Sequence, residues 1–119
     1  SSKTFTEGSY TLSLTGMSKV FGPAYDAKGN SCIKLGTSSK AGSFSLTVGA
    51  DVTKVVIYVA AYKSKTATID VNGTKTTLTK KSDNGEYDVI EIDTTTTKTI
   101  TFKVSSGYRA MVNTIEFYA

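Results

Sequence analysis

The stretch from residue 52 to residue 78 constrains the fold more than any other part of the chain. It contains the longest apolar run, Val55 to Ala61, which is rich in β-branched residues and is bounded by charged turn residues. Such a run favours a buried strand over a helix. Because both alternating faces of the run are apolar, we expect this strand to lie in the interior of a sheet.

An Asn-Gly pair at residues 72–73 separates two further alternating segments of the same stretch. It predicts a β-hairpin, because both residues tolerate the positive φ that a type I′ turn requires. A two-residue loop also fixes the register, so Asp70 should face Lys75 and Thr68 should face Thr77. The apolar residues then fall together on the opposite face, which supports the predicted pairing.

The remaining chain has the same character, and no segment shows a helical period. Turn signals recur roughly every 8 to 14 residues, which is typical of an antiparallel β-sandwich. We therefore predict an all-β fold, an antiparallel β-sandwich of the jelly-roll type, as one module over residues 1–119. After a polar lead-in over residues 1–8, further strands are expected at 9–14, 19–21, 32–35, 43–48, 87–92, 99–104 and 109–118.

The composition argues against most kinds of catalysis. The chain has no His and a single Cys, so neither a Ser-His-Asp triad nor a tetrahedral zinc site can be built from it. No glycine-rich phosphate loop precedes a helix. Cys32 is better explained as a small buried residue than as a reactive thiol. We expect a protein that is not an enzyme and needs no cofactor.

The charge pattern indicates a mildly basic surface without a dense cationic stripe. Formal net charge is +4, and the 13 Lys and one Arg are spread along the sequence. Phosphate recognition usually relies on Arg forks or dense Lys clusters, so we expect no nucleic-acid partner. No run of 18 apolar residues is present, so we expect no membrane partner either. The expected state is a monomer.

If consecutive strands run antiparallel, successive loops alternate between the two ends of the sandwich. Loops 37–42, 62–65, 80–86 and 105–109 should then share a basic and aromatic end. Loops 22–31, 49–53, 72–73 and 93–98 should share a more acidic end. That second end could hold a structural calcium ion, although no EF-hand-like spacing is present.

The basic and aromatic end is the better candidate for a ligand. Tyr rings suit the C–H faces and hydroxyls of sugars, and Arg and Lys donate to hydroxyl or carboxylate oxygens. Tyr108 and Arg109, beside a Gly in a short turn, are favoured, whereas Tyr62 and Tyr87 could equally cap the core. The candidate ligand-binding residues are Tyr62, Lys63, Tyr87, Tyr108 and Arg109, with Tyr25 and Asp26 in the longest loop as a second candidate site.

Three stretches carry a resemblance to a known group of domains. CIKLGTSSKAGSFSLTV, VTKVVIYVAAYKSKTATIDVNG and MVNTIEFYA resemble galactose-binding-like, jelly-roll accessory domains of secreted bacterial proteins, similar to non-catalytic carbohydrate-binding modules. The resemblance implies secretion, covalently linked catalytic or adhesive domains, and binding of a polysaccharide or oligosaccharide. Many such modules use Trp platforms, which this chain lacks. One alternative is a structural or protein-interaction module, such as a spacer or adhesin domain, without a small ligand. Another is weak binding of anionic polymers driven by the excess of Lys, which salt would weaken steeply.

Overall fold

The structure is a computed structural model that describes residues 3–7, 10–105 and 107–119, with side chains described from Met17 onward. Its described residues form 11 strands and one short 3-10 turn. The strands are β1 (Lys3–Glu7), β2 (Tyr10–Ser18), β3 (Val20–Tyr25), β4 (Ser31–Leu35), β5 (Ser43–Thr47), β6 (Lys54–Ala61), β7 (Thr68–Val71), β8 (Thr74–Thr77), β9 (Asp88–Asp93), β10 (Thr99–Val104) and β11 (Ala110–Tyr118), and the 3-10 turn is η1 (Ser82–Asn84).

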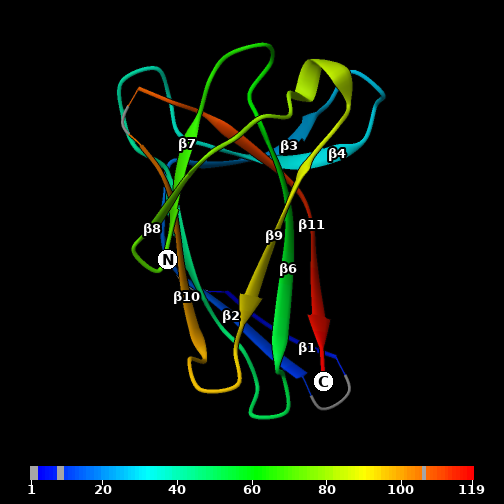
Figure 1. The fold of residues 1–119 in the computed structure, drawn as a ribbon, viewed down its shortest axis with the longest axis vertical. Coiled ribbons are helices and arrows are strands. Elements are labelled where there is room, and N and C mark those ends of the chain that lie inside the picture. The colour runs from blue at the N-terminus through cyan, green and yellow to red at the C-terminus, as the bar shows by residue number, and fades with distance from the viewer. Residues whose placement is uncertain (1–2, 8–9, 106) are drawn as a thin grey trace.

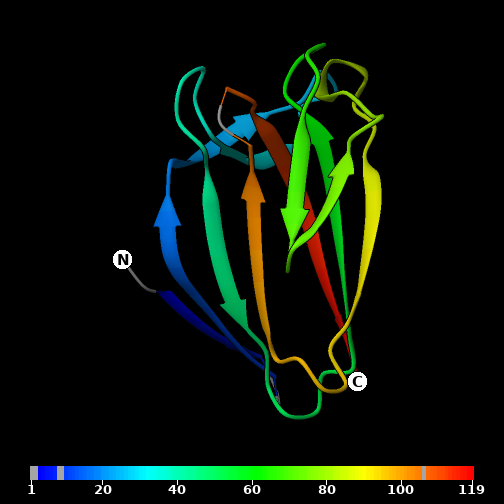
Figure 2. The same cartoon turned by 60° about the vertical axis from the view of Figure 1, so that its left-hand side comes forward.

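The strands pack as two antiparallel sheets, which confirms the predicted sandwich (Figure 1). One sheet has the order β1-β2-β5-β10-β7-β8 and the other β3-β4-β11-β6-β9. The chain changes sheet at every connection except the hairpins β1–β2, β3–β4 and β7–β8. Figure 2 shows this wrapping, in which strands distant in sequence become neighbours, as in a jelly roll.

The core lies between the sheets and follows the alternation of the strands. Inward side chains of β5 and β10 are buried, and the Phe44 and Phe102 rings stack with centroids 5.2 Å apart. Every residue of β6 except the half-buried Lys54 and Tyr58 is buried, so both faces of this strand are largely covered. This agrees with the interior position predicted from its apolar run, since β6 lies between β11 and β9. Strand β6 therefore forms the centre of the fold.

The hairpin of β7 and β8 has the predicted turn and register. Asn72 and Gly73 both have positive φ, 50° and 90°, as a type I′ turn requires. Asp70 pairs with Lys75 and Thr68 pairs with Thr77. Strand β8 is exposed along its whole length, and its polar Thr and Lys residues suit an edge strand.

Two predictions for the first part of the chain are wrong. In place of the polar lead-in predicted over residues 1–8, Lys3–Glu7 forms β1, paired antiparallel with β2. Loop 22–31 does not lie at the acidic end, because the Ala27 N–H donates to the Ser82 carbonyl at 3.1 Å, at the other end. The reason is the junction at Lys19, a residue with φ of 53°, where the chain passes from one sheet into the other without reversing as a hairpin does.

Candidate functional site

Loops from several parts of the chain meet at one end of the sandwich, the end where η1 lies in Figure 1. The Tyr62 N–H donates to the Arg109 carbonyl at 3.0 Å. The Lys63 N–H donates to the Ser82 hydroxyl at 2.7 Å. The loops that hold these four residues are therefore adjacent, as the sequence predicts. We call this the Tyr62 end.

The Tyr62 ring is surrounded by cations of its own chain. The Arg109 guanidinium carbon lies 4.4 Å from the ring centroid, and the amino nitrogens of Lys34 and Lys63 lie at 5.1 and 5.4 Å. These are cation–π distances, in which the negative face of the ring attracts the positive charge. We call these four residues the cation cluster. Because its cations already approach the Tyr62 ring, we expect this ring to organise charge and not to serve as a bare platform for a sugar.

Strands β3 and β4 extend the cation cluster on the outer face of the five-stranded sheet. Phe21 pairs with Lys34 across these strands, and their neighbours Val20 and Leu35 point into the core. Alternation therefore sends Phe21 and Lys34 outward. The Lys34 amino nitrogen lies 5.2 Å from the centroid of the Phe21 ring, which is 44% exposed. Sequence reasoning missed both residues, although in the strand predicted at 32–35 Lys34 alternates with the apolar Ile33 and Leu35 and so faces the opposite way.

Tyr108 and Arg109 line a small open pocket next to the cation cluster. The pocket has a volume of about 280 Å³ and is also lined by Lys65, Thr66 and Gly107. Gly107 has φ of 84°, a left-handed conformation that Gly adopts without steric cost, and the Tyr108 N–H closes the turn on the Ser105 carbonyl at 3.0 Å. Tyr108 is 40% exposed, so its ring is accessible beside two cationic side chains.

Asp26 and Tyr87, also predicted to bind a ligand, instead bond to each other. The Tyr87 hydroxyl donates to the Asp26 carboxylate and lies 3.2 Å from the Cys32 sulfur. The same carboxylate accepts the backbone N–H groups of Lys28 and Asn30, both at 2.9 Å, and the Asn30 side-chain amide at 3.0 Å. Asp26 is only 7% exposed. We call this pair the Asp26–Tyr87 clamp, because it ties the loop between β3 and β4 to the segment after η1.

The clamp changes the acidity of both partners. The hydrogen bond from Tyr87, together with those from Asn30 and Lys28, lowers the pKa of the Asp26 carboxyl to about 2, against the opposing effect of burial. Burial and the bond to Asp26 raise the pKa of the Tyr87 hydroxyl far above its ordinary value. Asp26 is thus a charged and fully bonded acceptor, and Tyr87 is a neutral donor. Neither is free to bind a ligand.

Tyr25 is a predicted site residue that is strongly exposed yet lies apart from the cation cluster. Its side chain is 64% exposed, and among the described residues no hydrogen bond or ring contact joins it to another side chain. It precedes the Asp26–Tyr87 clamp at the end of β3. The seven predicted site residues therefore separate into Tyr62, Lys63, Tyr108 and Arg109, which are brought together, and Tyr25, Asp26 and Tyr87, which are not part of that group.

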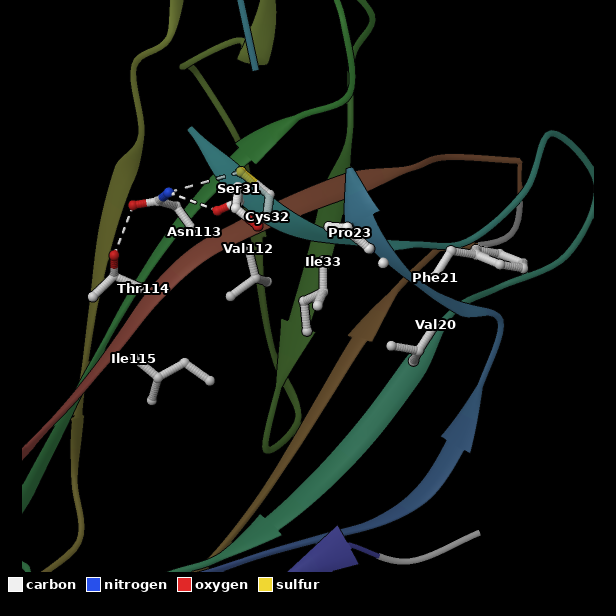
Figure 3. A pocket seen from close by; sticks show the side chains of 11 residues that line it. Val20, Phe21, Pro23, Ser31, Cys32, Ile33, Val112, Asn113, Thr114 and Ile115 are labelled. Carbon is white, nitrogen blue, oxygen red and sulfur yellow. Dashed lines mark hydrogen bonds between the residues drawn. The ribbon is translucent and has the colours of Figure 1, made fainter. Parts of the chain in front are cut away.

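A larger groove lies elsewhere, beside the first residues of β4, where β11 continues beyond that strand (Figure 3). It has a volume of about 510 Å³ and an apolar floor of Val20, Ile33, Val112 and Ile115. Its polar groups are largely engaged, since the Asn113 amide donates to the Ser31 carbonyl at 3.1 Å and accepts from the Thr114 hydroxyl at 2.7 Å. In Figure 3 the Phe21 ring points away from this floor.

The opposite end of the sandwich uses its charges within its own turns. The Asp93 carboxylate accepts the Thr95 N–H at 2.8 Å and the Thr95 hydroxyl at 2.6 Å, which lowers the pKa of Asp93. The Lys98 amino group donates to the Ala50 and Val52 carbonyls at 3.1 and 2.8 Å. Within the described part of the chain, no group of three or more Cys, Asp or Glu side chains is placed to hold a metal ion.

The fold defines the class of protein, an all-β sandwich with one cluster of cations and exposed aromatic rings at the Tyr62 end. Comparison with known proteins gave no match to a family model, to a curated protein or to a solved structure. Over the described residues, no helix has the length and apolar character needed to cross a membrane. The resemblance to carbohydrate-binding modules therefore stays a prediction, and the case for a function depends on the Tyr62 end.

Proposed function

We propose that this protein is a non-catalytic carbohydrate-binding module that holds a secreted parent enzyme near polysaccharide, with the ligand bound at the Tyr62 end. The observation that carries the proposal is the exposed Tyr108 ring beside Lys65 and Arg109 in one pocket. An accessible aromatic face next to hydrogen-bond donors suits the two sides of a sugar, its C–H face and its hydroxyls.

The shape of the site supports a polymer more than a small enclosed ligand. The Tyr108 pocket, at about 280 Å³, lies below the usual range for pockets that enclose a drug-sized molecule. It is open, and the exposed Phe21 and Lys63 lie on the same end of the sandwich. One or two sugar units can therefore occupy the pocket while the rest of the chain crosses the surface.

Binding to a panel of soluble polysaccharides, measured by affinity electrophoresis and calorimetry, tests this proposal. Tyr108→Ala should weaken binding by about tenfold, the effect of removing a central aromatic contact. Tyr118→Ala is the matched control, since Tyr118 is 42% exposed but lies at the C-terminal end of β11, away from the cation cluster. Absence of binding to every polysaccharide, or an equal loss in both variants, would contradict the proposal.

A second candidate function is a structural or protein-interaction module without a small ligand. It is favoured by the groove of Figure 3, which is larger than the Tyr108 pocket and has an apolar floor. The two functions predict different effects of substitutions in the groove and in the Tyr108 pocket. Ile115→Ser in the groove should leave polysaccharide binding unchanged if the first proposal is right.

A further inference from the structure

The cation cluster concentrates positive charge around one ring. Among the described residues, Lys34, Lys63 and Arg109 make ring contacts and form no ion pair with a carboxylate. Like charges held around one ring repel each other, and the cation–π contacts offset only part of this repulsion. A fold keeps such a local conflict mainly where a function uses it.

Two buried or half-buried acids at this end, Asp26 and Asp88, form hydrogen bonds with residues outside the cation cluster. The Asp26 carboxylate is bonded within the Asp26–Tyr87 clamp. The Asp88 carboxylate accepts the N–H groups of Thr79 and Lys80, each at 2.9 Å, and the Thr79 hydroxyl at 2.8 Å. In the described part of the chain, the other acids near η1 are exposed and form no ion pair with the cluster. The described acids at this end therefore leave the cations of the cluster available to a negatively charged ligand.

We infer that the Tyr62 end takes an acidic glycan, a polysaccharide whose carboxylate or sulfate groups lie against Arg109, Lys63 and Lys34 while a sugar ring packs on Tyr108. This inference rests on the proposed carbohydrate-binding function and specifies its ligand class. The planar guanidinium of Arg109 matches the paired oxygens of a carboxylate or sulfate. Lys63 and Lys65 are exposed and can follow charges along a flexible chain.

A nucleic acid is the other polyanion that such a surface could attract, and the geometry favours it less. Sequence-independent binding of single strands uses a cationic groove with successive stacking platforms. Here the cations gather around one ring, with the exposed Phe21 ring against Lys34 and the exposed Tyr108 beside Arg109. A sugar chain that packs one ring on Tyr108 beside several charges fits that arrangement better than a strand that stacks successive bases.

Matched polymers test the inference, because they change the charge of the ligand and little else. The intact chain is titrated with polygalacturonate and with its methyl ester, and with dextran sulfate and dextran. We expect the acidic member of at least one pair to bind about tenfold more tightly than its neutral partner. Raising the salt from about 50 to about 200 mM should reduce this difference.

Two double variants locate the effect on the surface. Lys63→Gln with Lys65→Gln and the control Lys75→Gln with Lys103→Gln each remove two positive charges from a formal net charge of +4. The control residues are exposed on β8 and β10 of the other sheet. The first pair should weaken binding of the acidic polymer by about tenfold, and the control by less than about twofold, with unfolding temperatures showing that both are folded.

Each other outcome has a definite meaning. Equal affinity for the acidic and neutral members of both pairs would overturn the inference and leave the carbohydrate-binding function standing. Equal losses in the two double variants would overturn the location of the site. Binding of polyglutamate or single-stranded DNA as tightly as the acidic glycans would overturn the acidic-glycan inference and the carbohydrate-binding function together. Absence of binding to any glycan would do the same.

Discussion

The Asp26–Tyr87 clamp and the cation cluster lie at the same end of one sandwich, yet the fold uses them in opposite ways. In the clamp, both carboxylate oxygens of Asp26 have partners within the chain, and the residue is 7% exposed. In the cluster, the cations surround a ring and meet no acid of their own chain among the described residues. The first arrangement stabilises loops, and the second leaves charge available.

This difference distinguishes structural from functional candidates at one end of the molecule. A polar residue whose hydrogen bonds are satisfied internally contributes to folding, and its loss leaves buried partners unpaired. A charged group without an internal partner contributes little to folding and can interact with a ligand. Substitutions in the clamp should therefore change mainly stability, and substitutions of the exposed cations should change mainly binding.

The largest effect on stability is expected at the clamp. Tyr87→Phe removes the hydroxyl that donates to the Asp26 carboxylate, so the free energy of unfolding should fall by about 1.5–3 kcal/mol, the usual range for a hydrogen bond to a charged group. Urea unfolding measures this loss. Tyr108→Phe is the control, because the Tyr108 hydroxyl bonds to no described residue, and it should change stability by less than about 0.5 kcal/mol. Similar effects in both variants would mean that the clamp does not hold the loops.

A smaller effect is expected at the centre of the cation cluster. Tyr62→Leu removes the ring and with it three cation–π contacts, so stability should fall by about 1–2 kcal/mol and glycan binding should weaken. Tyr62→Phe keeps the ring and should restore both properties almost completely. If Tyr62→Phe loses binding while it keeps stability, the hydroxyl of Tyr62 and not the ring contacts the ligand.

The smallest expected effect is a change in how strongly acid lowers the stability of the fold. The pKa of Asp26 is lowered to about 2 from an ordinary 3.8, so its contribution to stability is present above about pH 4 and is lost as the pH falls towards 2. Asp26→Asn should therefore be less stable than the wild type at neutral pH but should lose less stability between pH 4 and pH 2. Urea midpoints across this range measure the difference. The pKa of Asp93 is also lowered, so Asp93 also contributes stability that is lost in acid. The stability lost between pH 4 and pH 2 should therefore be smaller in Asp26→Asn than in the wild type, but not zero.

Much of the fold is predictable from the sequence because its signals are local. The Asn72-Gly73 turn requires positive φ at two positions, and that local requirement is enough to set the β7–β8 register. The apolar run of β6 likewise indicates an interior strand. The position of loop 22–31 is harder to predict, because it depends on the corner at Lys19, a single residue with φ of 53° that carries no strong turn signal.

The candidate site is predictable only in part, because cross-strand contacts depend on tertiary register. Tyr62, Lys63 and Arg109 lie in loops that alternation brings to one end. Lys34 joins them through the pairing of β4 with β11, which connects residues far apart in the sequence. Asp26 and Tyr87 have the residue types of a ligand site, and nothing in the sequence shows that they bond to each other.

The most direct test of an acidic-glycan site at the Tyr62 end is to map amide chemical shifts while an oligogalacturonate is added to the uniformly ¹⁵N-labelled chain. We expect the largest changes in the segments that build the cation cluster and the Tyr108 pocket, namely Lys34, Tyr62, Lys63, Lys65, Tyr108 and Arg109. Changes centred instead on the groove formed by Val20, Ile33, Val112 and Ile115 would contradict this site.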